Sequence, residues 1–324
     1  MMRNFVIKSF ILLLFSNSCL AEWYQGEEGI MGTNIQSEIW ADSPQLGEKA
    51  TQAVMAEMQR INQLMSPYIE SSELSLLNQG AADAAVKVGR ELFDLIALSL
   101  ELSKETAGAF DITFASVGYL YNYRDKQKPS ELEIAQLLDA IDYRHVVLDS
   151  SEQSIYFANK NVKIDLGGIA KGHAVDNAIN ILRSMGIKHA LVTAGGDTGL
   201  LGDRRGKPWM VGIRDPRNGE KQAVVLPLSN IALSTSGDYE RYFEQNGQRF
   251  HHILSPKSGK SAYHVQSVSI IGSSSTLNDA LSTAVFVLGV QEGMDLLNQT
   301  PGYDGIIMDN DRKLHYSKDL SAKK

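Results

Sequence analysis

The N-terminal part of the chain shows one strand-like pattern followed by two helical ones. Residues 31–40, MGTNIQSEIW, alternate with a period of two, which predicts a half-buried strand. Residues 46–65 instead repeat apolar side chains every three or four positions, which predicts an amphipathic helix. A second helix is expected over residues 90–107, because Gly108 supplies a common C-terminal stop.

The middle of the chain is less regular before it becomes helical again. Residues 66–79 read as a loop with a short helix, and residues 109–124 are irregular and rich in aromatic side chains. Residues 145–166 predict a hairpin or meander. The pattern after Gly168 is helical up to Gly186, with one face formed by Gly172, Val175, Ile179 and Leu182.

The C-terminal half is dominated by strand patterns. One helix is expected within it, DALSTAVFVLG, at residues 279–289. The predicted strands are the stretches HALVTAGGD, PWMVGIRDP, AVVLPL, IALSTSG, RFHHILSP, VQSVSIIG and DGIIMD. Runs of strands with a few helices between them indicate an α+β fold of mixed sheets with packed helices. Because no linker or repeat divides the chain, we expect a two-lobed single domain.

The N-terminus has the layout of a secretory signal peptide, with two basic residues, a short apolar run at residues 10–15 and then small residues. The run is too short for a bilayer span, which takes about 20 apolar residues. Cleavage after Ala21 would leave residues 22–324 as the exported domain. Cleavage before Cys19 would leave a cysteine for lipidation, but Ser16 stands where a lipoprotein signal has an aliphatic residue. The first alternative is favoured, and no later segment is expected to cross a membrane.

Composition narrows the class of protein. The chain has 324 residues, 43% of them hydrophobic, which allows a sizeable core. A net charge of −7 argues against a nucleic-acid partner, which needs a Lys/Arg face. Cys19 is the only cysteine, so cleavage after Ala21 would leave a mature chain without disulfides or thiol chemistry.

Two glycine turns, each beside an aspartate, are candidates for ligand contact. Gly167 and Gly168 precede a helix whose free N–H groups could face an anion, and AGGD at 194–197 follows a buried strand. Neither turn matches a P-loop or a dinucleotide fingerprint. From the residues alone, a structural explanation is favoured for each turn: a strand-to-helix connection at 167–168, and a cap formed by Asp197 at the second turn.

Asp279 and Thr283 are four residues apart on a predicted helix, so their oxygens share one face. A carboxylate and a hydroxyl suit a hard cation such as Mg²⁺. The alternative is an N-terminal Asp stabilised by the helix dipole and a Thr bonded to its own helix.

Two adjacent histidines, His251 and His252, lie on a predicted strand, so only one of them can face a given site. A histidine can serve as a general base, or it can be a satisfied structural residue. The chain has no His-x-x-x-His or cysteine pair for zinc, and no G-x-S-x-G serine-hydrolase elbow.

These pieces, in this order, resemble the ApbE-type flavin transferases over about residues 30–310. The stretches that carry the resemblance are MGT, MSPYIESSELSLLN, GAFDIT, DLGGIAKGHAVD, AGGD, TSGDYERYF, HHILSPKSG and DALSTAVFVLG. Two departures stand out. His173 occupies a position where many members have tyrosine, and ITFASVGYL replaces a common T-x-x-P-L pattern.

The resemblance implies an ApbE-like, T-fold-related architecture and a Mg²⁺-dependent reaction. FMN would pass from FAD to a Ser or Thr hydroxyl of a target flavoprotein through a phosphoester bond, and AMP would leave. The acceptor would be a subunit of a membrane Na⁺-translocating or related redox complex. The family acts outside the cytoplasm, which agrees with the signal peptide. The location would then be periplasmic, with inner-membrane anchoring as the lipoprotein alternative.

Residue roles also follow from the resemblance. The metal ligands would be Asp279, Thr283 and a backbone carbonyl at Gly168, and His252 would be the base that activates the acceptor hydroxyl. The residues lining the FAD site would be Met31, Tyr68, Ala109, Phe110, Asp111, Asp165 and Lys171.

Two other functions stay open. A periplasmic FAD pyrophosphatase would use the same metal site with water as the acceptor. A non-enzymatic FAD carrier would bind FAD without turnover.

Overall fold

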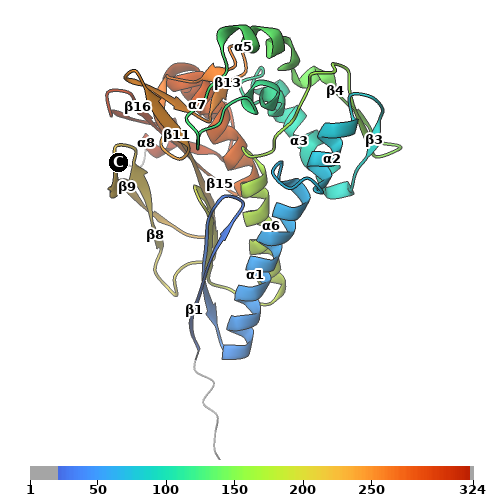
Figure 1. Ribbon diagram of the computed structural model, residues 1–324. Helices are drawn as coiled ribbons and strands as arrows, with labels where there is room; N and C mark the ends of the chain where they lie inside the picture. Colours follow the sequence, from blue (N-terminus) through green and yellow to red (C-terminus); the bar gives the residue numbers. More distant parts are fainter. Residues whose placement is uncertain (1–20, 322–324) are drawn as a thin grey trace, which may run out of the picture.

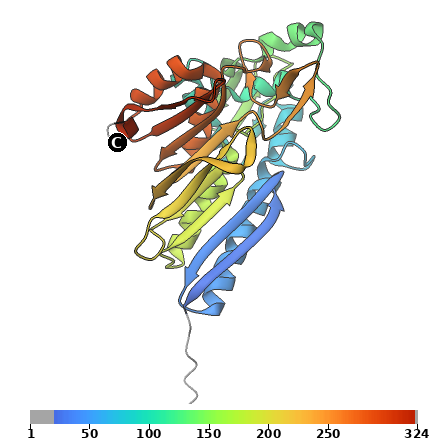
Figure 2. The ribbon, with the colours of Figure 1, turned by 90° about the vertical axis from the view of Figure 1, so that its left-hand side faces the viewer.

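The computed structural model describes residues 21–321. The predicted signal peptide, with Cys19, lies outside this range except for Ala21. Eight strands form one antiparallel sheet in the order β1-β2-β6-β7-β10-β15-β16-β17 (Figures 1 and 2). Their bounds are Glu22–Ile30, Thr33–Ala41, Ala190–Ala194, Asp197–Leu201, Ala232–Gly237, Val265–Gly272, Asp304–Asp309 and Leu314–Tyr316.

Three long helices pack side by side on one face of this sheet. These are α1 (Pro44–Met65), α6 (Ala170–Ser184) and α7 (Ser275–Asn298), and α6 contacts both of the others (Figure 1). A twisted ribbon of β8 (Trp209–Asp215) and β9 (Asn218–Leu228) shares an apolar cluster with β10, β15 and β16. The sheet is thereby buried between helices and ribbon.

The remaining elements form a cap at one end of the sheet. Most of them belong to the segment between β2 and β6, and two short hairpins are inserted between β10 and β15 (Figure 1). The helices are α2 (Glu73–Gly80), α3 (Arg90–Glu105), α4 (Ala115–Gly118) and α5 (Glu131–Leu137), and α8 (Lys318–Ser321) ends the described chain. Three 3₁₀ turns are η1 (Ile112–Phe114), η2 (Leu138–Ala140) and η3 (Tyr143–His145). The short strands are β3 (Val86–Lys87), β4 (Val146–Asp149), β5 (Ser154–Phe157), β11 (Tyr242–Gln245), β12 (Gln248–His251), β13 (Leu254–Ser255) and β14 (Lys260–Ser261).

The α+β prediction and the main helices are confirmed, but some elements were missed. Strand β1 carries no clean alternation because it is the edge strand and most of its side chains are accessible. Strand β7 was hidden because all five of its residues are buried and its sequence reads as the end of a glycine turn. Helix α7 continues past Gly289, whose φ of 80° interrupts the helical geometry without ending the element.

Helix α7 also corrects the expectation that no later segment could cross a membrane. By length and composition it is apolar enough to do so, and it is the one such helix within residues 21–321. Its contacts with α6, β10, β15 and β16 explain the composition, because a helix packed between layers is apolar on most sides. Asp279 and Asn278 are buried in its N-terminal half, whereas Glu292 and Asp295 in its C-terminal half are exposed.

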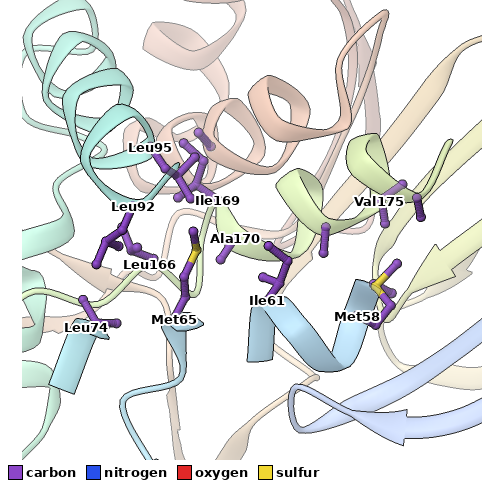
Figure 3. Packing of buried hydrophobic residues seen from close by; sticks show 14 of the residues in the cluster. Met58, Ile61, Met65, Leu74, Leu92, Leu95, Leu166, Ile169, Ala170 and Val175 are labelled. Atoms are coloured by element: carbon purple, nitrogen blue, oxygen red, sulfur yellow. The ribbon is translucent and has the colours of Figure 1, made fainter. Parts of the chain in front are cut away.

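The largest hydrophobic cluster lies where α1, α3 and α6 meet the cap (Figure 3). Ile61 and Met65 on α1 face Leu166, Ile169 and Ala170, which flank the Gly167–Gly168 turn (Figure 3). The turn is therefore held between apolar residues that are all nearly inaccessible to solvent. A rigid base of this kind limits how far the polar groups of the turn can move.

Helices α6 and α7 touch backbone to backbone at Gly172. A Cβ atom there would lie 2.2 Å from the carbonyl oxygen of Ser275 and 2.9 Å from the Cα of Thr276. One turn later, the Asp176 carboxylate accepts hydrogen bonds from the N–H groups of Ser275 and Thr276 and from the hydroxyls of Ser274 and Thr276. These bonds satisfy the free donors of the α7 N-terminus and stabilise its positive dipole end.

A charged cluster joins α1, α3 and α6, and it contains His173. The Arg60 guanidinium binds Glu57 and Glu91, with distances of 2.7 Å and 2.6 Å for the shortest pairs. His173 Nε2 lies 2.8 Å from Glu91 Oε1, and Asn177 donates to both glutamates. His173, which stands where many members of the family have tyrosine, thus links α6 to α3 through Glu91.

Gly172→Ala should destabilise the protein by about 3 kcal/mol, because the new methyl group overlaps rigid backbone of α7. Thermal unfolding would measure the loss as a lower Tm. Gly29→Ala is the matched control, since a Cβ at Gly29 meets nothing within 4 Å. Equal Tm values for the two variants would contradict the close helix contact.

Glu91→Gln should lower the free energy of unfolding at pH 7 by about 1–2 kcal/mol, a figure reduced for solvent screening of the exposed Arg60. Hydrogen bonds from Arg60 lower the pKa of Glu91 from 4.5 to about 2. A depressed carboxyl pKa stabilises the fold above pH 4.5, and this contribution disappears as pH falls towards 2. Urea unfolding of wild type and variant should therefore converge in acid, whereas a pH-independent gap would refute the ion pair. Asp94→Asn, in the exposed pair with Arg90, is the control and should leave the free energy of unfolding close to that of wild type.

Candidate active site

Several chain segments that are far apart in sequence meet at the cap end of the sheet. The turn between β6 and β7, at Gly195–Gly196, lies in this region. The Gly195 N–H donates a hydrogen bond to the Asn34 carbonyl at the start of β2. Strand β10 ends beside it, because Ser234 pairs with Asp197. The N-terminus of α6 and the second turn of α7 complete the group. The site is therefore built from strand ends and helix starts that the main sheet fixes.

A lysine bridges two buried aspartates at the centre of this region. Lys171 Nζ lies 3.1 Å from Asp197 Oδ2 and 3.3 Å from Asp279 Oδ2. The ammonium group also donates to the Gly167 carbonyl at 2.9 Å, and the Gly172 N–H donates to Asp279 at 3.2 Å. The predicted site residues Lys171 and Asp279 thus touch each other, although the resemblance gave them separate roles.

Because this cluster is buried, one ammonium group does not fully compensate two ionised carboxylates. Burial raises the pKa of Asp279 to about 7, the neighbouring Asp197 adds to the rise, and Lys171 opposes it. The same two aspartates raise the pKa of Lys171 above its usual value despite burial. Two carboxylates therefore share one ammonium, and a further cation would stabilise both of them in ionised form.

Thr283 and Gly168 lie next to each other beside Asp279. A Cβ on Gly168 would be 3.2 Å from Thr283 Oγ1, which is also 3.3 Å from Ser236 Oγ. Carboxylate, hydroxyl and backbone carbonyl oxygens are the donors that a hard divalent cation prefers, so this donor set fits Mg²⁺. No group of three His, Cys, Asp or Glu residues with metal-binding geometry occurs within residues 21–321.

The adjacent histidines have different surroundings, and strand β12 ends at His251, so His252 lies just beyond the strand on which both were predicted. His251 is buried, its Nε2 lies 2.7 Å from the Ala262 carbonyl, and its ring packs edge-on against Phe286. The ring of His252 makes no hydrogen bond to any residue that the structure describes, and its Nδ1 is buried. Burial lowers the pKa of His252 to about 3, and the cations Arg241 and Lys171 add to this effect. A pKa this low keeps the imidazole neutral, and its Nδ1 has no hydrogen-bond partner among the described residues.

The AFD segment supports the glycine turn. Ala109 and Phe110 are buried, and the Phe110 ring would lie 3.4 Å from a Cβ on Gly168. The Asp111 carboxylate accepts hydrogen bonds from the N–H and hydroxyl of Thr113 and from the Tyr143 N–H. Asp111 thus begins the 3₁₀ turn and anchors the chain at Tyr143, so its oxygens are already occupied by protein donors.

The other predicted FAD-lining residues surround the mouth of the site. Tyr68 lies on a loop and is 78% exposed, so its ring is free to stack on a planar ligand. Asp165 accepts from the Gly167 N–H at 2.6 Å, and burial raises its pKa. Met31 has a φ of 56° in the turn between β1 and β2, a conformation that costs energy for a side chain of this size.

Sequence reasoning left Asp197 and Ser236 without roles in the site. Asp197 was interpreted mainly as a cap, although a second glycine turn beside an aspartate was the signal available. Its burial against Lys171 depends on β6 and β7 pairing, which brings residue 197 within reach of residue 171. Ser236 reaches Ser282 and Thr283 only because β10 lies under α7.

Comparisons with known proteins identify the family of the chain. The sequence profile described as the ApbE family matches residues 31–307. The chain is 32% identical to a protein named FAD:protein FMN transferase from Treponema pallidum (strain Nichols), over 91% of this chain and 86% of that one. It is 31% identical to a protein of the same name from Haemophilus influenzae, over 77% and 75% of the two chains.

Solved structures show the same fold. A crystal structure of an ApbE protein from Thermotoga maritima superposes with a TM-score of 0.85 at 33% identity, covering 93% of this chain and 99% of that one. The flavin transferase ApbE from Vibrio cholerae gives a TM-score of 0.82 at 25% identity, covering 94% and 99%. The profile match spans most of the chain and includes every residue of the site described above, and the chain therefore belongs to the ApbE family.

Proposed function

We propose that this protein transfers FMN from FAD to a serine or threonine hydroxyl of a target flavoprotein and releases AMP, in a Mg²⁺-dependent reaction. The observation that carries the proposal is the buried cluster of Lys171, Asp197 and Asp279 beside the Thr283 hydroxyl. Such a group of oxygens and one ammonium suits a cation and a pyrophosphate together. The shared name of the relatives, FAD:protein FMN transferase, supports the same reaction.

The residues that would hold Mg²⁺ are Asp279, Thr283 and a backbone carbonyl at Gly168. When bound, the ion would neutralise charge that develops on the pyrophosphate. Lys171 is held by Asp197 and Asp279 at the base of the site, where its ammonium can orient a phosphate as a point charge. Buried Asp279 is kept in place by the Gly172 N–H, so the ligand geometry depends on the α6–α7 contact.

His252 would take the proton from the acceptor hydroxyl. The hydroxyl oxygen attacks the phosphorus of the FMN half, a new P–O bond forms, and the bond to the bridging oxygen of AMP breaks. A pKa of about 3 in the empty site makes His252 a weak base. Bound phosphate would raise this pKa, because an anion nearby stabilises the imidazolium form. The base thus becomes effective only when the dinucleotide is present.

Export is part of the proposal. The N-terminal leader would direct the chain to the periplasm, with either a soluble product beginning after Ala21 or a lipid-anchored one beginning at Cys19. The acceptor would be a flavoprotein subunit of a membrane redox complex, such as a Na⁺-translocating one. The mass of the mature N-terminus distinguishes the two products.

Incubating the purified protein with FAD, Mg²⁺ and a flavoprotein subunit that carries an acceptor Ser or Thr tests the reaction. We expect a fluorescent flavin band on the acceptor and one AMP per transferred FMN. Free FMN without an acceptor adduct would indicate an FAD pyrophosphatase. FAD binding without turnover would indicate a carrier.

Asp279→Asn should reduce Mg²⁺-dependent turnover by roughly 10²–10³, the usual cost of losing one group that stabilises the transition state. The amide retains a group that can accept from Gly172 N–H, so the circular dichroism spectrum should be unchanged. Asp295→Asn, an exposed aspartate on the same helix, is the control and should keep full activity. A fully active Asp279→Asn enzyme would eliminate this residue as a metal ligand.

His252→Gln should lower kcat for transfer by roughly 10²–10⁴, because a general base is lost, while Tm stays near that of wild type. His251→Gln should instead lower Tm, because His251 fills a buried site against Phe286 and the Ala262 carbonyl. Steady-state kinetics and thermal unfolding of both variants would separate the roles. Loss of kcat in the His251 variant alone would reverse the assignment.

A further inference from the structure

One hairpin presents both the candidate base and an arginine to the same site. Strands β11 and β12 pair Tyr242 with His251, and the His252 N–H donates to the Arg241 carbonyl at 3.1 Å. Arg241 is therefore the cross-strand neighbour of His252. Side chains of such a pair lie on one face of the hairpin with Cβ atoms about 5 Å apart. The guanidinium and the imidazole consequently point to the same side.

The Arg241 side chain also reaches the turn between β1 and β2. Its Nη2 would lie 3.1 Å from a Cβ on Gly32, next to Met31. Because Gly32 has no side chain, the Arg241 guanidinium can approach this turn closely. Arg241 spans the gap between His252 on one side and the Met31–Gly32 turn on the other.

The guanidinium of Arg241 is not committed to an acidic partner. The acidic residues around this hairpin are taken by other arginines: Asp238 by Arg217 and Arg249, Glu240 by Arg214, and Glu244 by Arg249. Within residues 21–321, Arg241 makes no ion pair and no side-chain hydrogen bond. An exposed arginine beside a site, left free while its neighbours are paired, is available for an anionic ligand.

The charge balance of the site favours an anion at this place. Lys171 is shared by two aspartates, so its single positive charge cannot balance both of them and a pyrophosphate as well. Burial raises the pKa of Asp165 and lowers that of His252, and the positive charge of Arg241 acts on both groups, which places this charge inside the region that the predicted FAD-lining residues surround. A pyrophosphate brings two negative charges that need a partner outside the Lys171 cluster.

We infer that Arg241 is a binding residue for the phosphates of the dinucleotide, which holds the pyrophosphate between the hairpin and the Met31–Gly32 turn. This inference rests on the proposed function, because it assumes that FAD is the ligand. The guanidinium donates paired N–H groups to phosphate oxygens, a geometry that lysine reproduces only as a point charge. Arg241 would thereby place the FMN phosphorus beside His252.

Fluorescence titration with FAD, FMN and riboflavin, in EDTA to prevent turnover, tests the inference. Arg241→Gln should weaken FAD and FMN binding about 10-fold, in line with one lost charge-assisted contact, and leave riboflavin unchanged. Arg241→Lys should recover part of the loss. Arg214→Gln removes an equally exposed charge from the same region and should bind all three like wild type.

The outcomes distinguish a failure of the proposed function from a failure of the phosphate-binding role of Arg241. Wild-type protein that binds no FAD would overturn the proposed function itself. Wild-type binding with an unaffected Arg241→Gln variant would overturn only the phosphate role. Equal weakening for riboflavin and FAD would show that Arg241 supports the fold of the site. A higher KM for FAD with kcat nearly unchanged, recovered in part by lysine, would confirm a binding residue.

Discussion

The close contact between α6 and α7 at Gly172 is the constraint on which the site depends. Because no side chain separates the two backbones there, the Gly172 N–H can reach Asp279 directly. Asp176 then caps the start of α7 with four hydrogen bonds, which fixes the register of that helix against α6. Lys171, one residue before the contact, is consequently aimed at the same carboxylate. A wider helix spacing would separate the groups that must act together.

Electrostatics at the site are incomplete without a ligand. Two buried carboxylates share one ammonium, a histidine is held neutral, and an arginine on the neighbouring hairpin has no acidic partner within the described chain. The two buried carboxylates cost free energy, because one ammonium compensates them only in part. In the proposed function, a divalent cation and a pyrophosphate would supply the missing partners of these groups. Binding sites commonly hold such uncompensated groups, because folding stability comes from the core elsewhere.

Much of the fold was readable because local patterns and tertiary packing agree. The periodicity of α1, α3 and α6 predicted these helices within a few residues, since each buries one apolar stripe. Patterns failed where burial is not one-sided. Strand β1 is exposed at the sheet edge, β7 is buried throughout, and α7 is buried on most sides, which made it resemble a membrane helix. In each case, the residues that the element contains depend on how many of its sides are covered by other elements, which the local sequence does not report.

The sequence by itself determined most of the helices and strands, the two glycine turns, and the i, i+4 pair of Asp279 and Thr283. These properties depend on residues that are close along the chain, so helix and strand periodicity is enough to derive them. Only the tertiary structure decided that Asp197 joins Lys171, that His173 binds Glu91, and that Arg241 stands free beside His252. Those contacts join residues up to 82 positions apart, as between Glu91 and His173, and they form only when sheet order and helix packing bring the segments together.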